Sequence, residues 1–190
     1  MSKETITLDQ YESQWAMHVG YYRHHESERR HKTQTDGSKA SNALDNHRRG
    51  AAAELALSKF LALPWNATVN TYNSFPDLDG QMEVRSKPNQ QPYMRIKQKT
   101  DNQKPHYIFV SVSRLGNRQF RIDGWIIGSD AMQQKYLVAN DPNSKQPEWH
   151  VPLDQLNNPS TLNSAVAKRI ASFRKARKRF QDELRTAVQK

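Results

Sequence analysis

Residues 76–97 constrain the fold more than any other stretch of the chain, because they combine acidic residues, a glycine and two strand-like runs. Asp77 and Asp79 precede Gly80, and a glycine after an aspartate favours a turn. The run 82–85 follows this turn, and 93–97 has the composition of a second strand. The order of these parts predicts two strands around a turn, with carboxylates placed where an enzyme could hold a metal ion.

The first of these strands has an alternating pattern. Successive side chains of a strand point to opposite faces of a sheet, so Met82 and Val84 should share one face, and Glu83 and Arg85 the other. Any half-buried strand shows such alternation. The signal therefore lies in the order of aspartate, turn and Glu-x-basic, and not in the alternation itself.

The rest of the chain predicts an α/β protein. A first helix should begin with Thr7 as its N-cap and run to about Arg30, and a second, capped by Asp45 or Asn46, should reach Leu61 before Pro64. The other predicted segments are strands over 67–72, 93–97, 106–113 and 119–127, a polar connector over 98–105, a short helix starting at 129–132 and a surface segment over 149–156.

Two groups of ring-bearing residues in the N-terminal part invite a functional interpretation. Aromatic and aliphatic residues recur at near-helical spacing in the first helix, which favours a core role over base stacking: Leu8, Tyr11, Trp15, Val19 and Tyr22. His24, His25 and His31 match no standard metal-ligand spacing, so a solvated basic loop over 24–39 is expected. In that loop Arg29, Arg30 and Lys32 could contact phosphates.

Charge points to a polyanionic partner. The chain has 29 Lys and Arg against 19 Asp and Glu, a net charge of +10, although simple solubility would also account for a basic protein. Zero cysteines exclude disulfides and thiolate zinc sites and fit a cytoplasmic protein. The sequence has no run of 18 apolar residues and no signal peptide at its start, so no membrane partner is expected.

The C-terminal stretch is the most charged element. Residues 164–190 carry nine Lys or Arg against Asp182 and Glu183, a balance of +7. Apolar residues at helical spacing predict an amphipathic helix: Val166, Ile170, Phe173, Phe180, Leu184 and Val188. Its basic face is expected to lie on DNA, with a protein partner and a membrane surface as alternatives; the contact residues would be Arg174, Lys175, Arg177 and Lys178.

The order Pro76-Asp77, then Glu83-Val84-Arg85, resembles the signature Asp…Glu-x-Lys of the PD-(D/E)XK nuclease superfamily. Glu54 on the second helix resembles the glutamate of that family's first helix, and 107–112 and 120–126 resemble its following core strands. The likeness covers roughly residues 45–130 and is strongest to a mostly uncharacterised branch from phages and environmental sequences. It implies a mixed four- to five-stranded sheet of the restriction-endonuclease-like type, flanked by helices, with helical N- and C-terminal extensions.

The resemblance also implies a site. Asp77, Glu83 and Arg85 would be the catalytic residues of a Mg²⁺- or Mn²⁺-dependent nuclease, and the metal ligands would come from Glu54, Asp77, Asp79 and Glu83, with Asp77 favoured over Asp79. Arg85 stands where the family has lysine. Arginine does not deprotonate in proteins, so it can stabilise phosphate charge but cannot act as a base. Lys97 on the neighbouring strand is a candidate substitute.

Three functions stay open at this point. The first is a nuclease acting on duplex or branched DNA, in phage DNA processing or recombination in the host cytoplasm, with a homodimer left open. The second is a catalytically inactive nuclease fold that binds DNA or inhibits a partner. The third is a basic phage structural or RNA-binding protein. The predicted parts are an N-terminal helix and basic loop over 1–44, a nuclease-like core over 45–160 and the basic helix over 161–190.

Overall fold

The computed structural model describes residues 4–30, 40–69, 76–79, 81–139, 146–172 and 175. The larger elements, in chain order, are β1 (Glu4–Thr7), α1 (Gln10–Arg29), α2 (Ala40–Leu61), β2 (Met82–Pro88), β3 (Tyr93–Lys97), α3 (Gln98–Asp101), β4 (Ile108–Arg114), β5 (Gln119–Ile127), α4 (Gly128–Ala131), β6 (Leu137–Val138) and β7 (Glu148–Pro152). A further helix covers residues 162–172. The protein is thus an α/β protein, as predicted.

A mixed sheet of four strands forms the centre of the molecule, in the order β1-β5-β4-β2. β2 is parallel to β4, whereas β4 and β1 are both antiparallel to β5. The parallel pair requires a crossover between β2 and β4, and that crossover contains β3 and α3. The predicted mixed sheet of four to five strands is confirmed in its four-stranded form.

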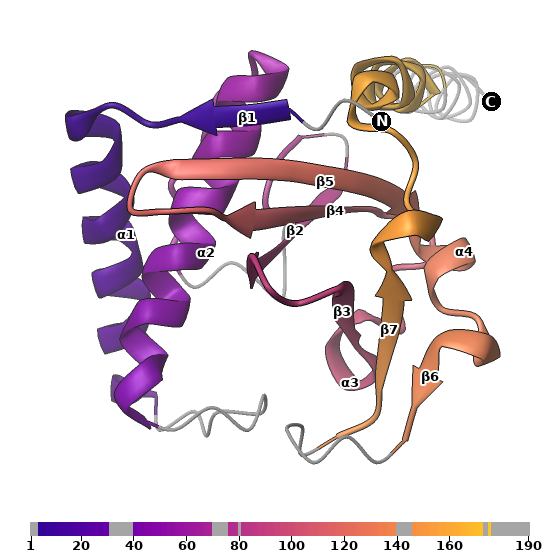
Figure 1. Ribbon diagram of the computed structural model, residues 1–190, viewed down its shortest axis with the longest axis horizontal. Helices are drawn as coiled ribbons and strands as arrows, with labels where there is room; N and C mark the ends of the chain where they lie inside the picture. Colours follow the sequence, from indigo (N-terminus) through magenta and orange to yellow (C-terminus); the bar gives the residue numbers. More distant parts are fainter. Residues whose placement is uncertain are drawn as a thin grey trace, which may run out of the picture.

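Helix α2 lies against one face of this sheet, and α1 packs on α2 (Figure 1). Met82 and Val84 of β2 and Val110 and Val112 of β4 are buried on that face. They pack against α2, whose alanines at 52, 53 and 56 let the helix approach the strands closely. Hydrophobic burial on this face accounts for the main core.

A second sheet, of order β3-β7-β6, is antiparallel throughout. Its apolar side chains, such as Met94 and Trp149, form a smaller core together with Phe109 of β4 and Ile126 of β5. Phe109 alternates with Val110 along β4, so it points to the face away from α2. The second sheet therefore covers part of the face that the helices leave open.

The contact between α1 and α2 depends on a glycine. A Cβ atom on Gly20 would lie 2.7 Å from the Arg48 backbone nitrogen and 2.9 Å from the His47 carbonyl carbon, closer than side chains approach a backbone. We expect Gly20→Ala to lower the free energy of unfolding by about 1–3 kcal/mol or more, because the helices must move apart. Thermal or urea unfolding followed by circular dichroism measures this effect.

Gly50 on α2 provides the matched control. A Cβ there has no heavy atom within 4 Å, so Gly50→Ala should raise the free energy of unfolding by about 1 kcal/mol through helix propensity alone. A Gly20→Ala protein as stable as the wild type would contradict the close packing of the two helices.

The N-terminal predictions need correction at the helix starts. Thr7 ends strand β1, which was not predicted, and Asp9 caps α1 in a capping box with Glu12, with backbone-to-carboxylate distances of 2.8 and 2.7 Å. Asp45 and Asn46 do not cap α2, since both lie inside it, although its predicted end at Leu61 is confirmed.

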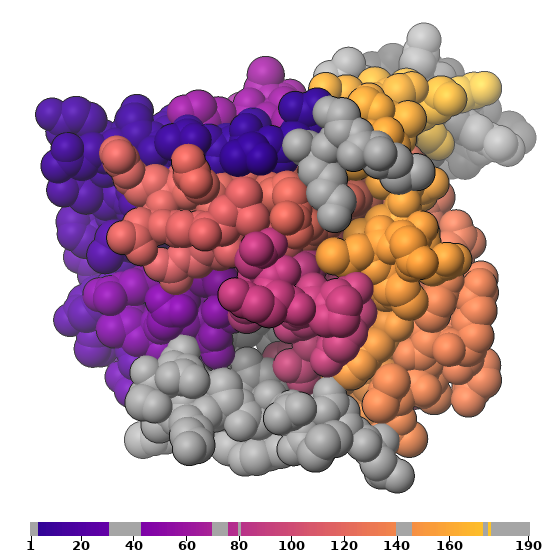
Figure 2. Space-filling view, in the orientation of Figure 1, coloured from indigo at the N-terminus to yellow at the C-terminus, as the bar shows by residue number. Residues whose placement is uncertain are grey.

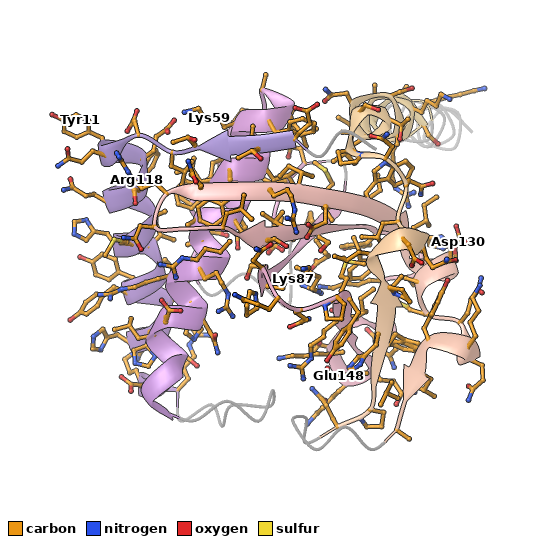
Figure 3. The ribbon with its side chains drawn as sticks, in the orientation of Figure 1. Tyr11, Lys59, Lys87, Arg118, Asp130 and Glu148 are labelled. Atoms are coloured by element: carbon orange, nitrogen blue, oxygen red, sulfur yellow. The ribbon has the colours of Figure 1, made fainter. Side chains whose placement is uncertain are left out.

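The aromatic residues of α1 are not in the core as predicted. Leu8 and Val19 are buried, but Tyr11, Trp15 and Tyr22 are 83%, 54% and 63% exposed. The helix turns these rings away from α2, and Figure 3 shows Tyr11 on the outer side. Trp15 makes an edge-to-face contact with Trp65, at 5.2 Å between ring centroids.

The strand predictions are mixed in outcome. The predictions over 93–97 and 119–127 match β3 and β5, 106–113 overlaps β4, and α4 forms near 129–132. The strand over 67–72 is wrong for 67–69, which have no regular structure, and 70–72 lie outside the described residues. The surface segment predicted over 149–156 is wrong at its start, which lies in β7, the middle strand of the second sheet, with Trp149 7% exposed; residues 152, 154 and 155 are exposed as predicted.

The structure describes the two basic segments only in part. His24 and His25 belong to α1, so the predicted loop is wrong for 24–29, and 31–39 lie outside the described residues. The predicted C-terminal helix is confirmed over 164–172, where Val166 is buried and Ile170 packs against the main core. Of its four predicted DNA contacts only Lys175 is described, as an exposed residue. In the described part of the chain, no helix has the length and apolar character needed to cross a membrane.

Candidate functional site

The predicted Glu-x-Arg motif lies on β2, with its two sides as expected. Met82 and Val84 enter the main core, while Glu83 and Arg85 occupy the opposite face. Glu83 is nevertheless only 3% exposed, because the crossover between β2 and β4 covers it. One prediction about this motif is wrong: β3 does not pair with β2, since the two strands belong to different sheets.

Glu83 and Arg85 take part in a ring of charges with two residues of the crossover. Lys104 Nζ donates to Glu83 Oε1 at 2.7 Å, and Arg85 Nη2 lies 3.3 Å from Glu83 Oε2. The same Nη2 donates to Asp101 Oδ1 at 2.7 Å, and Asp101 Oδ2 accepts from the Lys97 backbone N–H at 2.9 Å. We call these four side chains, Glu83, Arg85, Asp101 and Lys104, the charge ring.

Backbone contacts position Asp101 and Lys104, the two members of the charge ring that lie in the crossover. Asp101 ends α3, and the Lys104 N–H donates to the Asp101 carbonyl at 2.8 Å. The next residue, Pro105, accepts from the Ser129 N–H at 2.7 Å. A side chain on Gly128 would lie 3.0 Å from the Pro105 carbonyl oxygen, so this glycine lets the crossover lie directly on α4.

Asp77 approaches the same end of β2 from the preceding turn and not from an adjacent strand as predicted. A bridge between Leu78 and Met82 closes this turn, and Asp77 Oδ2 accepts from the Val84 N–H at 2.8 Å. Burial and the nearby Glu54 raise the pKa of Asp77 to about 6, although Arg85 opposes the rise. Asp79, two residues on, is exposed.

Glu54 is buried on α2 and is held by Arg23 of α1. Its two carboxylate oxygens accept from Arg23 Nη1 and Nη2 at 2.5 and 2.7 Å, and Trp65 Nε1 lies 3.3 Å from Oε2. Arg23 Nε also donates to the Thr68 carbonyl at 2.8 Å. The helix pair thus fixes Glu54 through a bidentate ion pair, the strongest geometry for these groups.

The carboxylates fit a metal ion only in part. In the described ranges, no group of three or more His, Cys, Asp and Glu side chains is arranged to hold one. Asp77 and Glu83 form a pair: burial raises the pKa of Glu83, Arg85 opposes this rise and Asp77 adds to it. Two such carboxylates fit Mg²⁺, which proteins commonly bind through one or two carboxylates with water and phosphate completing the shell. Glu54 does not fit as a third ligand while Arg23 occupies both its oxygens.

The predicted DNA contacts at the end of α1 take no part in the charge ring. Arg29 and Arg30 both bond Glu26 at the end of α1, at 2.6 and 2.7 Å. Lys32, Arg174, Arg177 and Lys178 lie outside the described residues.

Three residues of the site were missed in the sequence: Arg23, Asp101 and Lys104. Lys104 supplies an ammonium group to Glu83, a role for which Lys97 had been the candidate. The only signal was indirect, since a connector with two lysines and an aspartate follows the motif within 20 residues. Its place beside Glu83 depends on the parallel pairing of β2 with β4, which no local pattern reveals.

No family model matches the chain, and neither the curated proteins nor the solved structures contain a match.

Proposed function

We propose that the protein is a metal-dependent nuclease that hydrolyses phosphodiester bonds in DNA. The observation that carries the proposal is the pairing of two carboxylates with raised pKa, half-buried Asp77 and buried Glu83, beside the cations Arg85 and Lys104. A divalent cation favours the charged form of such carboxylates, and a phosphate group is attracted by the neighbouring cations.

The chain's own residues would divide the work. Asp77 and Glu83 would hold Mg²⁺ or Mn²⁺, which neutralises phosphate charge and activates a water molecule when bound. Lys104 and Arg85 would stabilise the negative charge that develops on the phosphate. Arg85 is held by Asp101 and stays protonated, so it serves as a fixed positive charge and not as a base.

The proposal extends to the fold and the partners. We propose that the mixed sheet is of the restriction-endonuclease-like type. In support, β2, which carries Glu83, is parallel to β4, and the crossover between them contains α3. The proposal also takes DNA as the substrate, in agreement with the net charge of +10, in a cytoplasmic setting.

A direct test combines cleavage assays with a matched pair of variants. The wild type should cut plasmid, linear or branched DNA in Mg²⁺ or Mn²⁺ and stop in chelator. Lys104→Met should lower the rate by about 10²–10³-fold, as expected for one lost charge-stabilising donor. Lys99→Met, an exposed lysine on α3 of the same crossover, should leave the rate unchanged.

Equal rates for the two lysine variants would remove Lys104 from the proposed chemistry. No cutting of any substrate by the folded wild type, with either metal, would overturn the nuclease proposal.

One observation favours a second candidate, an inactive nuclease fold that binds DNA. Glu83 is already neutralised by Lys104 and Arg85, and Glu54 by Arg23, so internal cations occupy the sites that metal would take. Such a protein would bind DNA equally well in metal and in chelator and would cut none. The same assays therefore separate the two candidates.

A further inference from the structure

A second group of charges lies on the same face of the four-stranded sheet as Glu83 and Arg85. Its centre is Asp123 of β5, whose Oδ2 accepts from Ser111 Oγ at 3.0 Å and Ser113 Oγ at 2.6 Å. Arg121 Nε donates to Asp123 Oδ1 at 2.8 Å, and Lys87 Nζ lies 3.6 Å from Oδ2. Neither the metal-site proposal nor the predicted motif uses these residues.

A β-bulge gives Asp123 this position. The register between β4 and β5 shifts at Ser111 and Val112, so that Asp123 is the extra residue. Gly124 follows with φ of +154°, and a Cβ there would lie 2.6 Å from the Leu156 side chain. The bulge thus directs Asp123 to both serines of β4 and to Arg121 on its own strand.

The charged groups on this face lie at two depths, with carboxylates inside and arginines nearer the surface. The carboxylate side chains are almost completely buried, at 0% exposure for Asp123 and 3–4% for Asp101 and Glu83. The arginines that they hold reach the surface, at 20% for Arg121 and 23% for Arg85. A molecule in solution therefore meets guanidinium groups that are already ordered, which lowers the entropy cost of binding an anion.

The outer part of the face extends this surface. Thr5 of β1 pairs with Arg121, and Thr7 pairs with Gln119. All three of these neighbours are exposed and carry hydroxyl or amide groups, which commonly contact phosphates. β5 and β4 pass in front of α2 in Figure 1, and the same view in Figure 2 shows β5 and β1 at the surface.

The chemistry of the face favours duplex DNA over a single strand. Proteins that bind single strands stack bases on exposed aromatic rings. The aromatic side chains of the four strands are unsuitable: Phe109 and Phe120 are buried, and Trp125 bonds to Asn158 and Thr161. A duplex presents its phosphates outward, and fixed guanidinium groups match that array.

We propose that Arg121, held by buried Asp123, contacts a backbone phosphate of duplex DNA, so that the duplex lies across β4, β5 and β1 with its scissile strand toward the charge ring. The proposal rests on the proposed function for its ligand and for the direction of the strand. Arg85 pairs with Ser111 of β4 and Arg121 pairs with Ser113, so the two arginines lie two strand spacings apart and two residues apart along the strands. The spacings of a sheet put their Cα atoms on the order of 12 Å apart. Arg121 is thus a positioning residue away from the cut bond.

Binding of a labelled 20-base-pair duplex in chelator, by fluorescence anisotropy at several salt concentrations, tests the proposal without cleavage. Arg121→Gln should weaken binding by about fivefold to tenfold and make the slope of log affinity against log salt shallower by about 0.9, the value for one lost phosphate contact. Lys135→Gln, which removes an exposed lysine near Tyr136, is the control and should change neither. Arg121→Lys should restore the slope but only part of the affinity, because lysine lacks the planar geometry that Asp123 holds.

Each outcome bears on the proposal in one direction. Equal affinity and slope for Arg121→Gln and Lys135→Gln would overturn it, and so would tighter binding of single-stranded DNA or RNA of the same sequence. Loss of duplex binding in Arg121→Gln, in a protein that cuts no DNA with any metal, would support this inference while the nuclease proposal fails. Cutting by a wild type whose Arg121→Gln variant binds normally would overturn this inference alone.

Discussion

Glu83→Gln should lower metal-dependent DNA cleavage by about 10³-fold or more, because it removes a charged metal ligand. Even the loss of a residue that only supports a metal ligand costs about 10–100-fold in metal affinity or activity. The fold should survive the change. An amide keeps the shape of the carboxylate, and its oxygen can still accept from Lys104 Nζ. Plasmid cleavage in Mn²⁺, with the thermal midpoint measured on the same sample, gives both results.

The control for this variant is Glu26→Gln. Glu26 bonds Arg29 and Arg30 on the outside of α1, so its replacement removes a carboxylate without touching the charge ring. Cleavage should persist at the wild-type rate. Full cutting by a folded Glu83→Gln protein would remove Glu83 from the proposed metal site.

Asp77→Asn should abolish cleavage and yet make the protein more stable at neutral pH. The Asp77 pKa rises from 3.8 to about 6 on folding, because burial and Glu54 disfavour the charged carboxylate. The folded state therefore holds a proton between about pH 4 and pH 6 that the unfolded state has lost. The stability of the wild type should fall as the pH rises through this window.

The size of the effect follows from the pKa difference. A rise of about two units corresponds to about 3 kcal/mol lost by pH 7, as an upper estimate. Asparagine has no charge to bury, and its side-chain oxygen can still accept from the Val84 N–H. Below about pH 4 both proteins should be equally stable, whereas above pH 6 Asp77→Asn should unfold at a temperature several degrees higher.

Asp79→Asn separates the two aspartates. Asp79 is exposed, so its variant should keep the pH dependence of the wild type and most of its activity. Urea unfolding at pH 4 and pH 8 shows the contrast most directly. A difference between wild type and Asp77→Asn that is the same at both pH values would contradict a buried, charged Asp77.

Regular periodicity explains which elements could be predicted. β5 matches its predicted range because polar and apolar residues alternate over it, and α2 ends at Leu61 because Pro64 follows closely. β1 could not be predicted, since four residues with two threonines become a strand only by pairing with β5. Trp149 and its neighbours were taken for a surface segment because a single aromatic residue does not show that strands lie on both sides.

Helical spacing failed for the aromatic residues of α1 for a different reason. Tyr11, Trp15 and Tyr22 share one side of the helix, as expected, but the helix packs on α2 through Gly20 and Val19 instead. Small residues that allow close approach can define a buried side as well as large ones do. A pattern of hydrophobicity alone therefore predicts the wrong side of the helix as the buried one.

The candidate site was predictable only where it is local in sequence. Asp77, Glu83 and Arg85 lie within nine residues, and the structure brings all three to one end of β2. Lys104 and Asp101 join them through a crossover whose path depends on the whole sheet. Contacts of this kind are set by strand pairing, which a single sequence does not disclose.

The crossover also sets how the site can open. β4 is buried along nearly its whole length and bonded on both sides, so its amide hydrogens should exchange with solvent only when the protein unfolds globally. α3 has four residues, and single backbone bonds hold the turn to Lys104. We therefore expect the amides of this segment to exchange at a smaller free energy than those of β4. Glu83 thus lies on the edge strand β2, between a sheet centre that should stay protected and a crossover that should exchange first.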